Sequence, residues 1–492
     1  MPEPLVLNPA DTVAILTEKG IAPAGHKIAR TAIAPGAAVI KYGQVIGYAT
    51  EGIAAGAHVH SHNCAFGEHG RDYRPGAGLA AAQAALERCR GPALNFDGYR
   101  RAGGQVGTRN FVALVATVNC SATVIRRAAE ELRIEGALAP FPHVDGVVAF
   151  AHGTGCGMAD SGPGWTALQR VLTGHAGHPN VGAALFVGLG CEVMQIARMK
   201  RELGQAARFH GLTIQENGGT RTTIDAIKAR VRALLPQVND IRRAPAPAAK
   251  LKIGLQCGGS DGFSGITANP ALGVACDMLA AQGASVVLSE TPEIYGAERL
   301  LLDRAASPAI AERLLERLRW WEDYAARNGA SLDNNPSPGN KAGGLTTILE
   351  KSLGAVAKAG ATPLNAVLDY AEPITAPGLN FMDTPGYDPV SATGQIAGGA
   401  QLIVFTTGRG SAFGSKPAPT IKLATNDALF AAMPDDMDLN CGDILSRGVP
   451  LETKAREIVD LILATASGRA TRSENLGLGD HEFVPWQIGA VV

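Results

Sequence analysis

Four cysteines stand out because each follows a segment that predicts a buried β-strand. These segments are apolar and rich in β-branched residues, and each gives way to a polar, glycine-rich turn. Cysteines at the ends of parallel strands can meet at one edge of a sheet and share a metal site. The alternative is that a small, soft residue suits a crowded turn, since free cysteine is commonly buried. The four residues are Cys120, Cys156, Cys191 and Cys257.

Three histidines occupy alternate positions, at His58, His60 and His62. Alternate residues of a strand project to one face, so three imidazoles can converge there on a metal ion or a substrate. Solvation of a polar strand end is the plainer explanation. His26, which precedes Lys27, is a further site candidate.

The remaining histidines divide into two kinds. His152 lies in a glycine-rich turn and is another site candidate, whereas His175, His178, His210 and His481 are expected at the surface.

Glycine-rich turns recur in the C-terminal half, at residues 257–265, 335–344 and 406–411. Backbone amides at helix N-termini, with Lys341 and Arg409 nearby, make good receptors for a carboxylate or phosphate. The alternative is that the glycines serve tight turns and the polar residues cap helices. None of the turns matches a P-loop or a dinucleotide-binding fingerprint, so no nucleotide cofactor is expected.

The chain has 492 residues, enough for about three domains at roughly 150 residues each. Its 44 basic and 45 acidic residues nearly cancel, so charge gives no reason to expect nucleic acid or a membrane as a partner. No apolar run reaches the length of a membrane helix, and the first residues lack the pattern of a signal peptide. Eight cysteines without a CxxC pair do not suggest a secreted disulfide framework. We therefore expect a globular, cytoplasmic protein.

The order of the predicted elements indicates a multidomain α/β protein. Short alternating segments between Gly and Pro turns predict a small β-rich module at the N-terminus. Further on, strands alternate with helices, as in open, Rossmann-like parallel sheets that bind ligands at the carboxyl ends of their strands. The predicted parts are a β-rich domain at 1–75, a linker with one helix at 76–97, an α/β domain at 98–243, a Pro/Ala linker at 244–250 and a large α/β domain at 251–492.

Taken together, these motifs resemble the altronate/galactarate dehydratase family of sugar-acid dehydratases, nearly from end to end of the chain. The matching motifs are Gly25-His26-Lys27, Ile40-Lys41-Tyr42-Gly43, Ile46-Gly47-Tyr48, Gly107-Thr108-Arg109-Asn110, the glycine-rich turn at 153–157, Gly188-Leu189-Gly190-Cys191-Glu192, Cys257-Gly258-Gly259-Ser260-Asp261, Asn335-Pro336-Ser337-Pro338-Gly339-Asn340-Lys341 and Thr407-Gly408-Arg409-Gly410. The resemblance implies that the N-terminal module is an SAF-type domain.

The resemblance also implies an activity and a set of site residues. The family dehydrates aldonic or aldaric acids of six carbons to 2-keto-3-deoxy acids with a divalent metal, typically Fe²⁺, with Mn²⁺ as an alternative. Lys341 and Arg409 are then expected to hold the carboxylate or hydroxyls of the substrate, and His26 or Lys27 to transfer a proton. The expected substrate-binding residues around them are Ser260, Asp261, Asn340, Thr407 and Gly408. The expected metal ligands are drawn from His58, His60, Glu192, Cys120, Cys156, Cys191 and Cys257.

Several alternatives stay open at this point. The segments 58–63 and 290–298 look closer to altronate than to galactarate dehydratases. A related branch, the sulfolactate sulfo-lyases, usually carries the SAF module on a separate chain, whereas here the two parts are fused. A non-catalytic sugar-acid binding protein is a further alternative, and so is an iron–sulfur dehydratase with the four cysteines as cluster ligands. The sequence leaves a homo-oligomer open as well.

Overall fold

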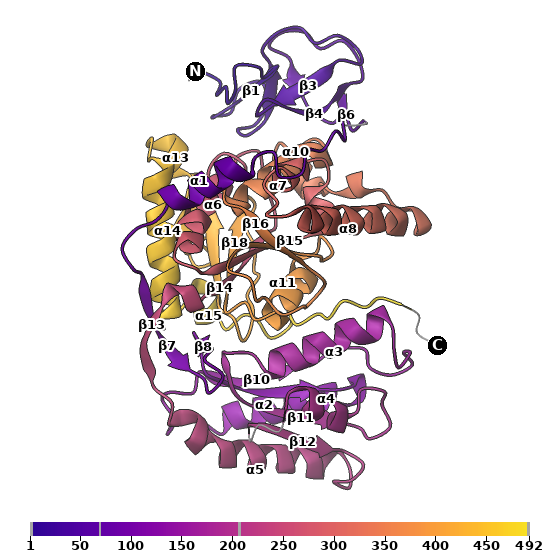
Figure 1. The fold of residues 1–492 in the computed structure, drawn as a ribbon, viewed down its shortest axis with the longest axis vertical. Helices are drawn as coiled ribbons and strands as arrows, with labels where there is room; N and C mark the ends of the chain where they lie inside the picture. The colour runs from indigo at the N-terminus through magenta and orange to yellow at the C-terminus, as the bar shows by residue number, and fades with distance from the viewer. Residues whose placement is uncertain (1–2, 68–69, 205–207, 490–492) are drawn as a thin grey trace.

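The computed structural model describes residues 3–67, 70–204 and 208–489. Three folded parts follow one another along the long axis of the molecule (Figure 1). A small β-rich domain lies at one end, a large parallel sheet covered by helices lies in the middle, and a second α/β domain lies at the other end. This arrangement confirms the predicted fold class.

The N-terminal β-rich domain consists of two small antiparallel sheets. Their strands are β1 (Val13–Ile15), β2 (Lys27–Ala29), β5 (His58–Val59), β3 (Ala38–Lys41), β4 (Gln44–Ala49) and β6 (Cys64–Ala65). Val39, Ile46 and Val59 are fully buried between them. This small core fixes the position of the histidines on and after β5.

The second α/β domain is built on a parallel sheet with the strand order β10-β9-β11-β12. Alternate residues of β9 face opposite sides, so that Val112 and Leu114 pack against α2 and α5 while Ala113 and Val115 face α3. The elements are β9 (Phe111–Ala116), α2 (Asn119–Ile134), β10 (Gly146–Phe150), α3 (Pro163–Ala176), β11 (Val181–Gly188), α4 (Ile196–Glu202), β12 (Phe209–Thr213) and α5 (Thr220–Asn239).

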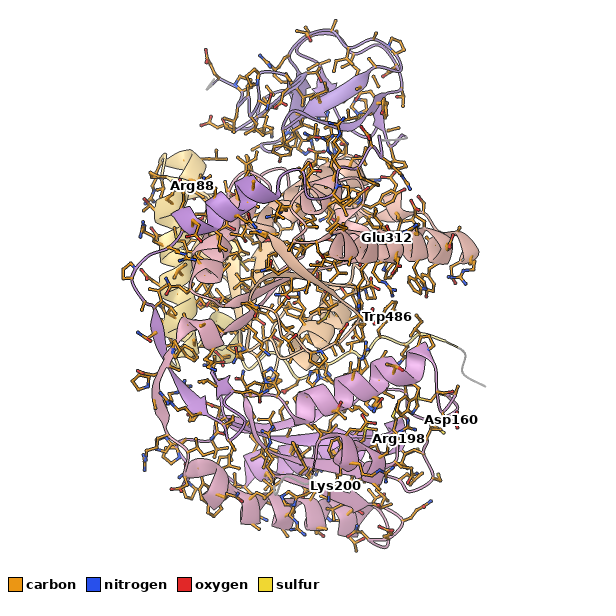
Figure 2. All side chains as sticks on the ribbon, viewed as in Figure 1. Arg88, Asp160, Arg198, Lys200, Glu312 and Trp486 are labelled. Atoms are coloured by element: carbon orange, nitrogen blue, oxygen red, sulfur yellow. The ribbon has the colours of Figure 1, made fainter. Side chains whose placement is uncertain are left out.

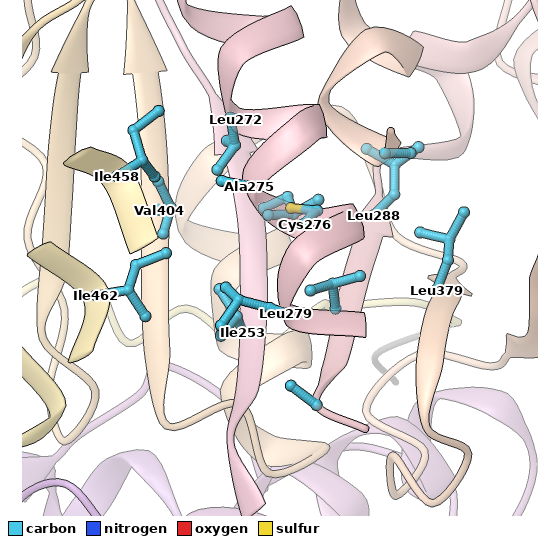
Figure 3. Close-up of a cluster of buried hydrophobic side chains, with 14 of the residues drawn as sticks. Ile253, Leu272, Ala275, Cys276, Leu279, Leu288, Leu379, Val404, Ile458 and Ile462 are labelled. Carbon is cyan, nitrogen blue, oxygen red and sulfur yellow. The ribbon is translucent and has the colours of Figure 1, made fainter. Parts of the chain in front are cut away.

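The large α/β domain contains a parallel sheet of seven strands in the order β16-β17-β15-β14-β18-β19-β20. Its strands are β14 (Lys252–Cys257), β15 (Ser285–Ser289), β16 (Leu364–Leu368), β17 (Gly378–Met382), β18 (Leu402–Thr407), β19 (Thr420–Ala424) and β20 (Leu439–Asn440). Side chains such as Leu279 and Ile462 pack helices α6 and α14 against one face of the sheet (Figure 3). The helix α11 covers the other face and packs against α3 of the second domain. The turn after β14 contacts the β-rich domain, where Gly262 lies against Gly25, so the carboxyl ends of the parallel strands face that domain.

The helices of this domain and the helix that precedes the second domain complete the chain. They are α1 (Leu79–Arg88), α6 (Ala268–Ala281), α7 (Arg299–Leu302), α8 (Pro308–Arg327), α9 (Pro338–Ala342), α10 (Ile348–Val356), α11 (Asp388–Ala397), α12 (Asp427–Ala432), α13 (Asp443–Ser446), α14 (Leu451–Ala466) and α15 (Arg472–Asn475).

The Pro/Ala segment predicted as a linker at 244–250 forms regular structure instead. Its first half belongs to β13 (Arg243–Pro247), which pairs antiparallel with β7 (Asn95–Arg100), and β7 also pairs with β8 (Val106–Gly107). A proline lacks an N–H donor, which excludes it from central strands but not from an edge strand such as β13. The prolines therefore indicated an edge strand and not a flexible connection.

The prediction that His175 and His178 lie at the surface is wrong, because both are almost fully buried in the second domain. His175 donates from Nδ1 to the carbonyl of Val171 at 2.9 Å, and His178 donates from Nε2 to the carbonyl of Ala400 at 3.0 Å. Burial lowers the pKa of His175 to about 4 and that of His178 to about 3.

These histidines predict a loss of stability in acid. A histidine whose pKa is lowered in the folded state stays neutral while the unfolded chain takes up a proton, so stability falls as the pH drops below about 6.5. At pH 4.5, His175 alone is expected to cost on the order of 2 kcal/mol relative to pH 7. Denaturant titrations at several pH values test this. His175→Phe is expected to flatten the acid limb of the profile, and His481→Phe, at an exposed position, controls for the loss of one histidine. An unchanged acid limb in His175→Phe would contradict the assignment.

Candidate active site

The carboxyl edge of the large sheet brings three of the glycine-rich turns together around Asp261. This buried carboxylate accepts hydrogen bonds from the hydroxyl of Thr425 and the side-chain amide of Asn426, each at 3.0 Å, and from the backbone and hydroxyl of Ser264 at 2.9 Å. A Cβ atom on Gly408 would lie within 2.3 Å of its Oδ1, so this position requires glycine. Asp261 therefore ties the turn after β14 to the turns after β18 and β19.

A cavity of about 850 Å³ opens beside this network. Residues of the β-rich domain form part of its wall, and the exposed side chain of Arg409 lies on it. Other lining residues are Pro23, Ala24, Asp261, Ala342, Gly343 and Gly408. Its volume falls in the range typical of small-molecule sites.

The β-rich domain docks on this edge through close backbone contacts. A Cβ atom on Gly262 would lie 2.0 Å from the carbonyl oxygen of Gly25, so the two turns touch at a distance that only glycine allows. His26 Nε2 lies 3.2 Å from the carbonyl oxygen of Ala342, and His60 Nε2 lies 2.8 Å from that of Lys341. Both carbonyls belong to α9, so this short helix orients two of the predicted histidines.

His26, His58 and His60 form a compact group that we call the imidazole cluster. Their ring centroids lie 5.1 to 5.4 Å apart, and His26 Nδ1 lies 3.0 Å from His58 Nε2. Burial lowers the pKa of all three, and the neighbouring imidazoles lower that of His58 further, to about 4. The cluster is therefore uncharged at neutral pH. His62 is exposed and contacts only the margin of the cluster, through His58.

Lys27 does not face the cavity, which corrects its expected role in proton transfer. Its ammonium is fully buried and donates to Glu350 Oε2 at 2.9 Å and to the carbonyl of Gly344 at 2.6 Å. Lys41 donates to the other oxygen of Glu350, also at 2.9 Å. Burial alone would raise the pKa of Glu350, but the two ammonium groups outweigh it and hold that pKa well below its usual range. The three residues are thus a buried ionic link between the β-rich and large domains.

A second polar group, which the sequence did not predict as a unit, lies buried after β14 and β15. Donor atoms of Cys257, Glu290 and Glu293 lie within 4.8 Å of one another, a spacing that can hold a metal ion. Glu290 adopts a left-handed backbone with φ 71°, and neither of its carboxylate oxygens has a hydrogen-bond partner among the described residues. Burial, followed by the charge of Glu293, raises the pKa of Glu290 well above its usual value. The only signal in the sequence was an acidic residue directly after a buried strand.

Cationic side chains already neutralise this second group. Lys351 donates to Glu293 Oε1 at 2.6 Å. Lys358 is also buried nearby, and its positive charge acts to lower the pKa of both Glu290 and Glu293. Burial and the charge of Glu293 raise the pKa of Asp388, on α11, to about 7. The group therefore combines carboxylates, ammonium groups and a thiol, and none of its residues is among those that line the cavity described above.

The remaining predicted substrate-binding residues shape the turns. Asn340 caps α9 and donates to the carbonyl of Ser260 at 2.9 Å, while the hydroxyl of Thr407 accepts from the backbone of Gly410 at 3.0 Å. Their side chains hold α9 and the turn with Arg409 in place.

The predicted metal ligands do not form one site. Cys120, Cys156, Cys191 and Glu192 follow strands of the second domain, at the opposite end of the molecule from His58 and His60 (Figure 1). Cys257 belongs to the large sheet and is buried. The structure thus separates the set into three places.

Comparison with known proteins decides the family. Residues 9–66 match the altronate/galactarate dehydratase SAF domain, residues 98–239 the second domain of D-galactarate dehydratase/altronate hydrolase, and residues 248–491 the C-terminal domain of D-galactarate/altronate dehydratase. The chain belongs to the altronate/galactarate dehydratase family. It is therefore an enzyme of the hydro-lyase class, and its β-rich domain is an SAF domain.

Curated relatives cover most of the chain. An altronate dehydratase of Escherichia coli is 39% identical over 458 residues, which span 92% of this chain and 89% of the relative. An altronate dehydratase of Bacillus subtilis is 36% identical over 92% of this chain and 88% of the relative. A galactarate dehydratase (L-threo-forming) of Escherichia coli is 36% identical over 93% of this chain and 88% of the relative.

Metal dependence, which this dehydratase family suggests, is compatible with the imidazole cluster. A carbonyl can only accept, so the contacts with α9 place the proton of His26 and of His60 on Nε2 and leave a lone pair on each Nδ1. Histidines that bind a metal commonly donate their other N–H to a backbone carbonyl in this way. These two Nδ1 atoms therefore suit a divalent metal ion, but the three rings do not bring donor atoms within 4.8 Å of one another, as Cys257, Glu290 and Glu293 do.

Across the described ranges, no helix combines the length and apolarity needed to cross a membrane.

Proposed function

We propose that the protein dehydrates altronate, an aldonic acid of six carbons, to the corresponding 2-keto-3-deoxy acid, with Fe²⁺ as the metal and Mn²⁺ as a substitute. The observation that carries the proposal is the cavity between the SAF and large domains, where the cationic Arg409 and the residues that flank the imidazole cluster line one wall. The choice of altronate as the substrate rests on the similarity of this chain to the two altronate dehydratases.

The chemical difficulty of the reaction is the weak acidity of the proton next to a carboxylate. Removing this proton creates a second negative charge on the carboxylate, which fixed positive charge and preorganised hydrogen-bond donors stabilise. A base must take the proton, and an acid must protonate the departing hydroxyl. When bound, a divalent metal polarises the oxygens of the substrate.

The residues of this chain can share these tasks. His26, His58 and His60 would hold the metal behind the cavity wall, where His26 contacts the wall residue Ala342 and α9 fixes the orientation of two of the rings. Arg409 and Lys341 would bind the carboxylate and a hydroxyl, since neither cation has an ion pair within the described part of the chain and Arg409 is exposed on the cavity wall. The SAF domain would exclude water by closing one side of the cavity.

The function is tested with a panel of aldonic and aldaric acids, using protein purified without oxygen and assayed with Fe²⁺, with Mn²⁺ and with chelator. We expect release of a keto acid from altronate that the chelator abolishes and Fe²⁺ restores. Turnover of galactarate alone would assign the protein to the other activity of the family. No turnover of any sugar acid in the presence of either metal would contradict the proposal.

Removing the guanidinium of Arg409 is expected to lower kcat/KM for the true substrate about 100-fold, because a charge-assisted contact to the carboxylate contributes on the order of 2–3 kcal/mol. Arg409→Lys is expected to recover part of the loss, since lysine keeps the charge but not the planar fork. Steady-state kinetics measure both variants. Arg447→Ala removes an exposed arginine just outside the cavity and serves as the control. An Arg409→Ala enzyme as active as the control would remove this residue from the site.

A further inference from the structure

Three cysteines of the second domain remain without a role in the proposed reaction. All eight cysteines of the chain are free thiols, and the exposed ones are Cys120, Cys156 and Cys191. The other five are buried or only partly exposed. Exposed thiols are therefore confined to the segments that follow β9, β10 and β11, with Cys120 in the first turn of α2 and the other two in loops.

These loops lie at one edge of one sheet. The strands β10, β9 and β11 are neighbours and run parallel, so the loops that follow them leave the sheet on the same side. Figure 2 labels Asp160 and Arg198, which come shortly after Cys156 and Cys191 in the chain, and both lie on the same side of the domain.

Hydrogen bonds tie the loop with Cys156 to the central loop. His152 donates from Nε2 to the carbonyl of Ala116, at the end of β9, at 2.9 Å, and accepts on Nδ1 from the backbone of Thr154 at 3.3 Å. The backbone of Asn119, directly before Cys120, donates to the carbonyl of Thr154 at 2.9 Å. Burial lowers the pKa of His152 to about 4, so this ring stays neutral and keeps its role as a brace.

The loop with Cys191 is tied to the same point from the other side. Thr117 donates its hydroxyl proton to Glu192 Oε1 at 2.7 Å, and the backbone of Gly190 donates to Glu192 Oε2 at the same distance. Gly188 lies so close to Glu192 Oε1 that a Cβ atom would sit 2.0 Å away. Glu192 is therefore a brace for its loop, and the loops with Cys156 and Cys191 are both fixed to residues 116–119, directly before Cys120 at the start of α2.

The spacing of the thiols distinguishes between kinds of metal group. A single tetrahedral ion with metal–sulfur bonds of about 2.3 Å holds its thiolates about 3.8 Å apart. Within the described chain, only the Cys257 group has three donor atoms within 4.8 Å of one another, so the exposed thiols are spread more widely than one ion requires. An iron–sulfur cluster binds each thiolate through a different iron and therefore spreads its ligands farther apart.

We propose that Cys120, Cys156 and Cys191 hold an iron–sulfur cluster of the cubane type, with one iron open to an oxygen ligand. Each thiol loses its proton to solvent when it binds iron. Three thiolates leave one iron of such a cluster without a protein sulfur, and the exposure of the loops gives that iron access to solvent or to a small molecule. The cluster would lie at the opposite end of the molecule from the SAF domain, so it is separate from the metal at the imidazole cluster and does not depend on the proposed substrate (Figure 1).

The test uses the full-length protein purified without oxygen, or reconstituted with Fe²⁺ and sulfide. We expect a brown protein with broad absorption near 400 nm, with iron and acid-labile sulfide in equal amounts beyond the iron that a mild chelator removes. Cys120→Ser, Cys156→Ser and Cys191→Ser are each expected to lower the sulfide content more than tenfold, whereas Cys89→Ser, at a partly exposed thiol of another domain, is expected to leave it unchanged. Zinc without sulfide, or sulfide retained in the triple variant, would overturn the proposal.

A measurement on the unmodified protein covers the case in which the variants do not fold. Alkylation followed by mass spectrometry is expected to find the three exposed cysteines protected in the protein as isolated and reactive after oxidative loss of the cluster. Cys89 should react to the same extent in both samples. Three cysteines that react fully in the iron-loaded protein would overturn the proposal, whatever the outcome of the sugar-acid assays.

Discussion

Glu350→Ala is expected to destabilise the protein by about 3–5 kcal/mol and to release the SAF domain from the large domain. The reason is that the two ammonium groups of Lys27 and Lys41 would stay buried without a counter-charge, which costs far more than an exposed ion pair contributes. Denaturant unfolding measures the loss of stability. Limited proteolysis between the SAF domain and α1 measures the release.

Two variants separate the charge effect from a loss of packing. In Lys27→Met/Lys41→Met/Glu350→Leu the charges are removed together, and apolar groups of similar volume take their place. This triple variant is expected to regain most of the stability, because a fully apolar replacement of a buried ionic triad is often neutral or better. Lys416→Met removes a cation from an ion pair with the exposed Asp480 and should change stability by less than about 1 kcal/mol. A Glu350→Ala protein as stable as Lys416→Met would contradict the assignment of this link.

The same triad explains why the sequence assigned Lys27 to the wrong task. The resemblance to the family offered Lys27 as an alternative to His26 for proton transfer, and nothing local in the sequence marks Lys27 as buried. Its partner Glu350 is 323 positions away in the chain, so only the docked domains reveal the pairing. The strands themselves can be found in the sequence, since residues 111–117 and 251–256 are largely apolar runs that agree with β9 and β14 to within one residue. Local hydrophobic patterns determine elements, whereas contacts between domains determine which polar side chains face the cavity.

The predicted metal ligands show both what a local sequence pattern can predict and what only contacts between elements reveal. The alternation of His58 and His60 is a local signal, and the structure places both in the imidazole cluster with His26. The sequence does not show Cys257, Glu290 and Glu293 as one group. Cys257 ends β14, whereas the two glutamates lie more than 30 residues later, in and just before the short helix Thr291–Ile294. Glu192 and the cysteines of the second domain cannot join His58 and His60 at one ion, because they lie in a different domain. Two sheets with similar strand ends lie in different domains, and the sequence pattern alone does not tell them apart.

His60→Ala is expected to abolish stoichiometric binding of Fe²⁺ or Mn²⁺ and to lower kcat/KM more than about 100-fold. Removing a group that only orients a metal ligand typically costs about 10–100-fold, and removing the ligand itself should cost more. Equilibrium dialysis with Mn²⁺ measures binding directly, and sugar-acid kinetics measure the effect on turnover. His62→Ala is the matched control, because His62 shares the alternating pattern but is exposed and is oriented by no contact with α9.

Glu290→Gln decides between the two groups that can hold the metal. If the imidazole cluster binds the ion, Glu290→Gln keeps Mn²⁺ binding at the level of His62→Ala, since the amide replaces a carboxyl whose pKa burial has already raised well above its usual value. If the buried group binds it, Glu290→Gln loses the ion and His60→Ala keeps it. The second outcome would overturn the assignment of the metal to the imidazole cluster. The first is expected because Lys351 already balances the charge of Glu293, whereas the lone pairs on His26 and His60 have no competing cation in contact.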